Sequence, residues 1–357
     1  MTAQPDTTGT RQGKIRVGSP EGLVAVVPQL LRFMPASSIV VIGIAASGSV
    51  KVTLRYDLPD PECAAGTAAD VIAILTSQRL TAAIAVGYGP EPLVTPMADA
   101  LRHAAEHAGV DLRDVLRVED NRYWSYTCAN PACCPAAGTR FDYAVIAART
   151  RISESRPVLS SRDALAATVS PLGDRPRQSM RQATRRAEQH VARVLATTEA
   201  SATPDAARKA IAEEGIAVVA NLIVVYRSSS RRRINYDTFA MATVALADKR
   251  VRDDTWTRMD PEYAEVHQGM WTDMVRRAQP GYVAAPACLL AFVAWQTGYG
   301  PLAHVALDRA LADDPDCLVA RMLRQIISAG APPSLARFPM TPEQIAASYD
   351  DQCTRST

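Results

Sequence analysis

Apolar residues fall into two alternating patterns along the first 160 residues, and together these patterns predict a sheet flanked by helices. Continuous apolar runs rich in β-branched residues indicate strands with both faces covered. Segments in which apolar residues recur every three or four positions indicate helices with one buried face. The patterns predict helices that begin at Pro20 and span 63–79 and 92–108, and strands at 37–46, 50–59, 81–88 and 112–119. This alternation is typical of an α/β domain with a mixed sheet, whose first two strands form a hairpin across a Gly-containing turn.

The pattern changes near residue 160, and almost every later segment has helical spacing. We therefore expect two domains, which a chain of 357 residues also favours. The segment 284–327 carries small residues at the spacing of one tetratricopeptide-like helical hairpin, because small side chains let two helices approach closely. The predicted organisation is a disordered tail at 1–13, an α/β domain at 14–160, an all-α helical domain at 161–344 and a disordered tail at 345–357.

Composition narrows the class of protein. Hydrophobic residues make up 48% of the chain and charged residues 21%, which is the balance of a globular protein. The formal net charge of +2 disfavours a chain built as a whole to coat nucleic acid or an acidic membrane. The first dozen residues lack the apolar core of a secretory signal, and the seven cysteines favour free or metal-bound thiols over a disulfide framework. These features predict a cytoplasmic protein.

The stretch 123–142 is the least typical of a helix or a strand, and it holds three of the seven cysteines. Cys128, Cys133 and Cys134 have the spacing C-x4-C-C, and thiolates are ligands that zinc prefers. Because adjacent cysteines rarely both reach one metal ion, we expect at most two of the three to coordinate zinc. Buried free thiols that pack the loop are the first interpretation, and a structural zinc site is the alternative.

Two histidines are candidates for the remaining zinc ligands. His103 and His107 lie one turn apart on the predicted helix that precedes the cysteines. Their H-x-x-E-H order also matches one class of metalloprotease, in which two imidazoles hold zinc and the glutamate acts as base. Both histidines lie beside the apolar face of the helix, however, and this position favours exposure to solvent over metal binding.

The cysteine motif carries a resemblance to a known family. Trp124, Ser125 and Tyr126 stand before C-x4-C-C-P, and a Gly-Thr pair follows. This combination resembles an actinobacterial family of domains of unknown function, family 4192. The resemblance extends to the segments FMPASSIVVIGI, VRDDTW and PLAHVALDRALADDP, and so covers most of the chain. It implies a shared fold and supplies no activity.

A second candidate site follows the strand at 81–88. Gly87 and Gly89 stand at the carboxyl end of this strand, where open sheets often bind ligands. Glycine allows a nucleotide-like ligand to approach the backbone, although the third glycine and the lysine of known phosphate-binding loops are missing. The candidate ligand-binding residues are Gly87, Gly89, Trp124, Ser125 and Tyr126.

A basic patch is predicted in the second half of the chain. Arg177, Arg181 and Arg185 recur at every fourth position of a predicted helix, so they line one face of it. Arginines in this arrangement can hold phosphates, but neither interleaved aromatic residues nor a known nucleic-acid-binding motif accompanies them. A solvated helix face is favoured, and nucleic acid is not an expected partner.

The sequence contains no recognisable catalytic constellation, since it has no Ser-His-Asp order, phosphate loop or paired carboxylates at interpretable spacing. We therefore expect a non-catalytic interaction protein whose protein partner or small ligand occupies the groove between the two domains. The alternatives are an enzyme that binds a nucleotide-like molecule with the α/β domain, and a module stabilised by zinc. A membrane is not an expected partner, because prolines and charges interrupt the most apolar run, 24–54. The sequence specifies no oligomeric state.

Overall fold

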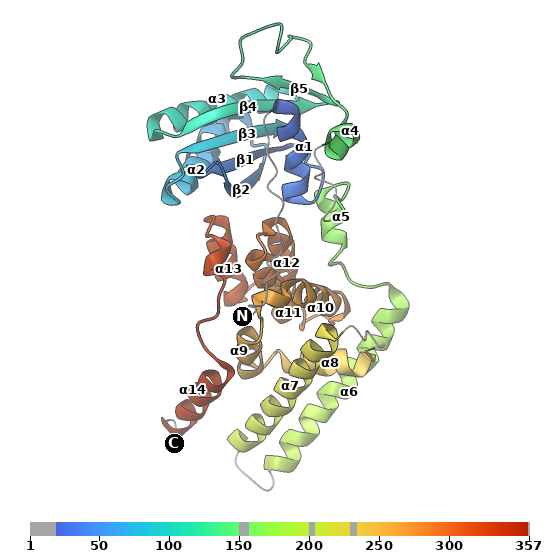
Figure 1. Ribbon diagram of the computed structural model, residues 1–357. Coiled ribbons are helices and arrows are strands. Elements are labelled where there is room, and N and C mark those ends of the chain that lie inside the picture. The colour runs from blue at the N-terminus through green and yellow to red at the C-terminus, as the bar shows by residue number, and fades with distance from the viewer. Residues whose placement is uncertain (1–18, 150–156, 200–203, 229–233, 356–357) are drawn as a thin grey trace, which may run out of the picture. The chain divides into compact units, whose positions relative to one another are not determined.

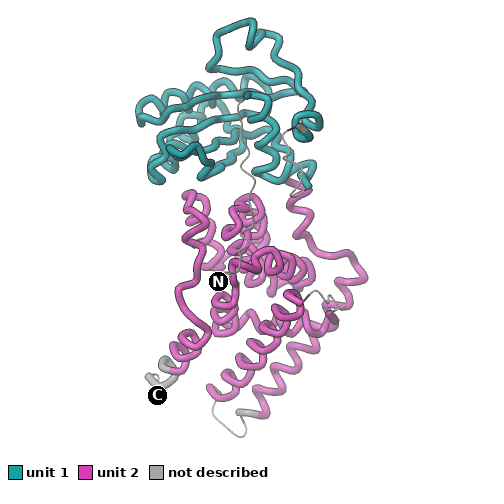
Figure 2. The backbone as a smooth tube through the Cα atoms, viewed as in Figure 1, with its two compact units in different colours: residues 1–161 teal, residues 162–357 magenta. Residues whose placement is uncertain are grey.

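A six-stranded mixed sheet forms the centre of the first part of the chain (Figure 1). The computed structural model describes residues 19–149, 157–199, 204–228 and 234–355, and the chain divides into two units, Met1–Ser161 and Arg162–Thr357 (Figure 2). The tail expected at 1–13 lies outside the described residues. The strands are β1 (Ser38–Ile44), β2 (Val50–Asp57), β3 (Ala82–Tyr88), β4 (Asp111–Glu119), β5 (Arg122–Ser125) and β6 (Thr139–Arg140), in the spatial order β2-β1-β3-β4-β5-β6.

The pairing of these strands follows from their connections. β1 and β2 form the antiparallel hairpin predicted from the sequence, with Val41 opposite Leu54. β3 runs antiparallel to β1 but parallel to β4, because α3 (Glu91–Ala108) carries the chain from the end of β3 back to the start of β4. All seven residues of β1 are buried, as expected for a strand covered on both faces.

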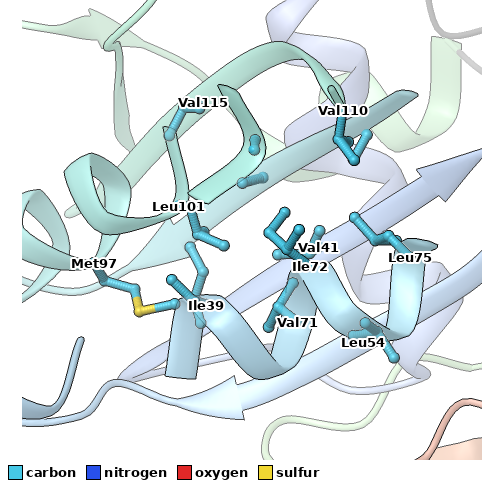
Figure 3. Packing of buried hydrophobic residues seen from close by; sticks show 14 of the residues in the cluster. Ile39, Val41, Leu54, Val71, Ile72, Leu75, Met97, Leu101, Val110 and Val115 are labelled. Carbon is cyan, nitrogen blue, oxygen red and sulfur yellow. The ribbon is translucent and has the colours of Figure 1, made fainter. Parts of the chain in front are cut away.

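Helices lie on both sides of the sheet (Figure 1). α2 (Ala64–Ser77), which follows a 3-10 turn at Pro61–Cys63, packs with α3 against one face, and the shared core includes Ile39, Val41, Val71, Leu101 and Val115 (Figure 3). α1 (Pro20–Leu31) and α4 (Tyr143–Arg149) lie on the other side, joined by a 2.9 Å hydrogen bond from the Gln29 side-chain amide to the Tyr143 hydroxyl. The predicted α/β architecture, a mixed sheet flanked by helices, is confirmed.

The described elements of the second unit are helices, which confirms the predicted all-α character of the second half. α11 is the most buried of them, since every residue from Pro286 to Trp295 is buried. α11 and α12 form a helical hairpin around the turn at Gly298, and its tetratricopeptide-like character stays a prediction. None of the helices in the described ranges combines the length and the apolar character that a bilayer span requires. The helices are α5 (Arg162–Ala167), α6 (Asp174–Glu199), α7 (Pro204–Arg227), α8 (Tyr236–Ala245), α9 (Lys249–Thr257), α10 (Ala264–Arg277), α11 (Ala284–Gln296), α12 (Gly300–Asp313), α13 (Leu318–Ser328) and α14 (Pro342–Arg355), with 3-10 turns at Pro261–Tyr263 and Pro333–Leu335.

α14 runs through much of the stretch 345–357, for which the sequence predicted a disordered tail. The hydroxyl group of Tyr349 donates a hydrogen bond to the Asp253 carboxylate at 2.7 Å. The Asp350 carboxylate accepts a hydrogen bond from the Arg250 guanidinium at 3.0 Å. Both partners belong to α9, far away in the sequence, so the polar composition of the segment gave no indication of them.

A buried histidine makes the stability of the second unit depend on pH. His267, on α10, is 1% exposed, and neither of its ring nitrogens has a hydrogen-bond partner among the described residues. Burial first, and then the positive charge of Arg227, lower the pKa of His267 from 6.5 to about 4. The folded protein therefore holds the neutral imidazole.

We expect the free energy of unfolding to fall by up to about 3 kcal/mol as the pH is lowered from about 7 to about 4. The unfolded chain binds a proton at His267 near pH 6.5, whereas the folded chain does so only near pH 4. This contribution to stability is therefore complete above pH 6.5 and is lost as the pH falls toward 4. Denaturant unfolding of the wild type and His267→Leu across this range measures the contribution of His267. The leucine variant should lose that part of the slope, whereas His304, whose pKa is also lowered by burial, contributes in both proteins. His103→Gln, which changes an exposed histidine, should keep the slope; an unchanged slope in His267→Leu would contradict the assignment.

Candidate metal centre

The three clustered cysteines belong to a loop of residues 126–138, the cysteine loop, which connects β5 to β6 at the edge of the sheet (Figure 1). β4 and β5 are joined by the two-residue turn Asp120-Asn121, in which φ is 48° and 56°. Positive φ at both central residues is the requirement of a type I′ turn, which matches the twist of a hairpin and favours Asp and Asn. This turn fixes the course of β5 and so the point where the cysteine loop begins.

Trp124 fastens the end of the cysteine loop to the sheet. Its indole N–H donates a hydrogen bond to the Ala136 carbonyl at 3.0 Å. Its ring lies so close to Gly138 that a Cβ at that position would be 2.5 Å from the ring, and Gly138 has φ 73°, which glycine adopts without strain. The buried guanidinium of Arg117, which donates a hydrogen bond to Glu119 at 2.6 Å, lies 3.7 Å from the centroid of the ring. Trp124 thus packs between the loop and a buried cation.

Asp114 holds the beginning of the cysteine loop. Its carboxylate accepts hydrogen bonds from the hydroxyl groups of Ser125 at 3.1 Å and Thr127 at 2.7 Å. The Ser125 oxygen in turn accepts the backbone N–H of Cys128 at 3.1 Å. The position of Cys128 is therefore set by hydrogen bonds that lead back to β4.

A tight turn at Asn130 brings the other two cysteines back toward Cys128. The carbonyl oxygen of Asn130 accepts the backbone N–H groups of Cys133 at 3.1 Å and Cys134 at 2.8 Å. The Asn130 side-chain oxygen accepts the N–H of Ala132 at 3.0 Å, which is the local bonding that makes asparagine frequent in turns. As a result, the Sγ atoms of Cys128, Cys133 and Cys134 all lie within 4.8 Å of one another.

This separation fits a zinc ion bound by three thiolates. A Zn–S bond of about 2.3 Å places neighbouring sulfurs of a tetrahedral site about 3.8 Å apart, so the sulfurs need to approach by at most about 1 Å. The sequence led us to expect that at most two of the three cysteines could share a metal, but the structure brings all three Sγ atoms together. That expectation treated adjacent side chains as divergent, whereas the turn at Asn130 lets both Cys133 and Cys134 face Cys128.

The three thiols are accessible to solvent, unlike the buried thiols expected from the sequence. Cys133 is exposed, and Cys128 and Cys134 are half-buried, whereas cysteine is ordinarily among the most buried residues. The backbone N–H of Asn130, together with the neighbouring thiols, lowers the pKa of Cys128. The hydrogen bond with Cys128 raises the pKa of Cys134 to about 12, because a second thiolate beside the first is disfavoured. The cluster therefore needs a cation to hold more than one negative charge.

His103 and His107 do not join this cluster. Both are exposed on α3, their ring centroids are 4.1 Å apart, and Nδ1 of His107 lies 2.8 Å from the His103 carbonyl oxygen. Across the described ranges, the three cysteines are the side chains grouped closely enough to share a metal ion. The H-x-x-E-H order is thus a feature of an exposed helix surface.

The two glycines at the end of β3 are required by packing and backbone conformation. A Cβ on Gly87 would overlap Cγ1 of Val94, a fully buried residue of α3. Gly89 has φ 147°, and a Cβ there would lie 3.0 Å from Leu58. The space beside both glycines, where a nucleotide-like ligand would approach the backbone, is filled by side chains of the protein.

We expect Gly87→Ala to destabilise the first unit by about 1–3 kcal/mol, because the added methyl group overlaps a stiff β-branched side chain in a packed core. Gly87→Ala combined with Val94→Ala should be less destabilised than the two single changes summed, since the second change removes the atom in contact. Thermal or urea unfolding of the four proteins gives this coupling. Gly66→Ala is the matched control, because no atom lies within 4 Å of a Cβ built there. Strict additivity would show that the overlap does not govern this site.

The remaining candidate residues make contacts within the protein. The Tyr126 hydroxyl lies 2.6 Å from Oγ1 of Thr95 on α3, and Trp124 and Ser125 hold the cysteine loop as described above. The side chains of the basic patch are exposed along α6 in the second unit, and their binding to phosphate stays a prediction; they are Arg177, Arg181 and Arg185.

Sequence reasoning missed three residues that shape the candidate metal centre. Asn130 could have been found, because Asn followed by Pro marks a turn. Asp114 and Arg117 gave no local signal, since their roles come from β4 lying beside β5. Both residues act through the pairing of β4 with β5, which the spacing of residues along the chain does not reveal.

Comparison with known families identifies one family for this chain. Residues 20–334 match the family described as Domain of unknown function (DUF4192). The match covers most of the 357 residues, so the chain belongs to this family, and the resemblance predicted from the cysteine motif is confirmed. No curated protein and no solved structure matches the chain.

Proposed function

We propose that this member of the DUF4192 family binds one zinc ion through Cys128, Cys133 and Cys134, and that the metal holds the cysteine loop as a recognition element for a ligand or partner. The observation that carries the proposal is the convergence of three solvent-accessible thiols within 4.8 Å. The proposed site lies entirely within the first unit.

The charges of the cluster favour a soft divalent cation. Three thiolates at this separation repel one another, as the opposite pKa directions of Cys128 and Cys134 indicate. A zinc ion compensates two of the three negative charges and displaces the thiol protons, so its affinity should rise with pH. Thiolate ligands favour zinc over magnesium or calcium, which prefer oxygen. The thiols must stay reduced to bind, which is why we place the protein in the cytoplasm.

The proposed site leaves one coordination position free for a ligand. Zinc is ordinarily tetrahedral, and sites with three protein ligands keep their fourth position for water or an exogenous donor. The flanks of the cysteine loop are exposed, including Pro131, Ala132, Pro135 and Ala136. A donor atom from a small molecule or a partner side chain can therefore reach the metal from solvent. We infer a binding role for this site.

Metal analysis of the untagged, reduced full-length protein tests the proposal. We expect about one zinc per chain after growth with zinc and removal of loosely bound metal, and the same content in Cys63→Ser, which changes an exposed cysteine outside the loop. A zinc content near zero in both proteins would end the proposal. Cobalt-substituted protein then reports on the fourth position. We expect added imidazole to alter the cobalt absorption bands, and unchanged bands would show that the chain itself closes the site.

A further inference from the structure

A second pair of cysteines comes together in the second unit. Cys288 lies on α11 and Cys317 immediately precedes α13, and their Sγ atoms are 3.9 Å apart. The two residues are separated by 29 positions and by the whole of α12. Because the cysteine loop belongs to the first unit, this pair is independent of the candidate metal centre.

The two thiols differ in their access to solvent. Cys288 is 1% exposed and lies in the buried stretch of α11. Cys317 is half-buried at the N-cap of α13, between the exposed residues Asp316 and Leu318. A reagent from solution therefore reaches Cys317 first, and Cys288 is placed behind it.

The pKa values of the two thiols also differ, and they differ because of their electrostatic surroundings. The hydrogen bond from Cys288 is the largest cause that lowers the pKa of Cys317 to about 6, with the Ala320 backbone N–H and the Arg252 guanidinium acting in the same direction and burial opposing them. The hydrogen bond with Cys317 and burial raise the pKa of Cys288. Cys317 is thus the nucleophilic thiolate at neutral pH, and Cys288 keeps its proton.

We propose that Cys317 is a site of oxidation by hydroperoxides and that Cys288 resolves the product as an intramolecular disulfide. In the first step the Cys317 thiolate attacks one oxygen of hydrogen peroxide. The O–O bond breaks, a sulfenic acid forms, and hydroxide leaves and takes up a proton to become water. In the second step the sulfur of Cys288 displaces the hydroxyl group of the sulfenic acid. The S–S bond forms as the S–O bond breaks, and the Cys288 proton leaves with the hydroxyl group as water.

The two sulfurs each lose one electron in this sequence, and the peroxide gains both. A disulfide bond is about 2.0 Å long, so the sulfurs must approach by about 2 Å. Cys317 stands at the N-cap of α13, and we expect rotation of its side chain to provide this movement. The cross-link then fastens the start of α13 to α11 and closes a loop that contains α12. We expect it to raise the thermal midpoint of the second unit by about 5 °C or more, because it restricts the unfolded chain.

Peptide mapping of the full-length, zinc-loaded protein tests the proposal. After treatment with equimolar hydrogen peroxide, free thiols are alkylated and the chain is digested with trypsin without reduction. Cleavage after arginine places Cys288 in peptide 278–309 and Cys317 in peptide 310–321, whereas the loop cysteines share peptide 123–140. We expect the first two peptides to appear linked, and the link to disappear on reduction. Free Cys288 and Cys317 in peroxide-treated protein, with Cys63 oxidised at the same dose, would overturn the proposal.

Two variants separate the roles of the thiols. Cys317→Ser should abolish the linked peptides and leave Cys288 unmodified. Cys288→Ala should let the sulfenic acid persist on Cys317, where a 1,3-dicarbonyl reagent traps it. If the reagent trapped a sulfenic acid on Cys288 in Cys317→Ser, formed at the wild-type rate, Cys288 would be the thiol that is oxidised first. That result would contradict the proposal. Cys288 is buried, so its replacement can impair folding. The peptide map of the wild-type protein therefore tests for the disulfide without relying on that variant.

Discussion

Cys134→Ser should lower the affinity of the protein for zinc by more than about 100-fold. Loss of a hydrogen-bonding partner outside the first coordination sphere already costs about 10–100-fold in affinity. Loss of a direct thiolate ligand should cost more, because serine is nearly isosteric but remains protonated and is a poor ligand for zinc. The Sγ of Cys134 is one of the three atoms that converge within 4.8 Å, so no described side chain of the cluster replaces it.

Competition with a chromophoric chelator at fixed pH measures this difference in affinity. Cys63→Ser is the matched control, because it removes an exposed thiol from the same unit and leaves the cysteine loop intact. The wild type and the control should give the same affinity. If Cys134→Ser also matched them, the metal would be held elsewhere, and the convergence of the three sulfurs would have no role in binding.

Trp271→Ala should destabilise the second unit by about 3–5 kcal/mol. Trp271 lies on α10 with no exposed surface, and it is among the largest fully buried side chains of the described residues. Truncation removes much apolar contact and leaves a cavity that the packed helices cannot fill. Its indole N–H has no hydrogen-bond partner in the described part of the chain, so the loss comes from packing rather than from a broken hydrogen bond.

Urea unfolding followed by circular dichroism at the helical band gives the change in free energy. Leu318→Ala serves as the comparison, because Leu318 is 68% exposed and its truncation should change the free energy by no more than about 0.5 kcal/mol. Equal effects of the two substitutions would mean that α10 is not part of the stable core.

The sequence determined those parts of the fold that depend on short-range patterns. The buried strands, the hairpin of β1 and β2 and the helical second half all follow from periodicity and turn residues within a few positions of one another. The cysteine motif also pointed to the correct family. The contacts of α14 lay beyond such short-range patterns, since its partners are on α9.

Tertiary structure alone decided how the chemical groups meet. The spacing C-x4-C-C allowed at most two zinc ligands, but the turn at Asn130 and the hydrogen bonds from Asp114 bring three sulfurs together. Gly87 lies at a position typical of ligand binding, and only the packing of Val94 shows why a side chain is excluded there. Cys288 and Cys317 meet because α11 and α13 pack side by side. Contacts of this kind depend on which elements are neighbours in space, and local periodicity contains no information about that choice.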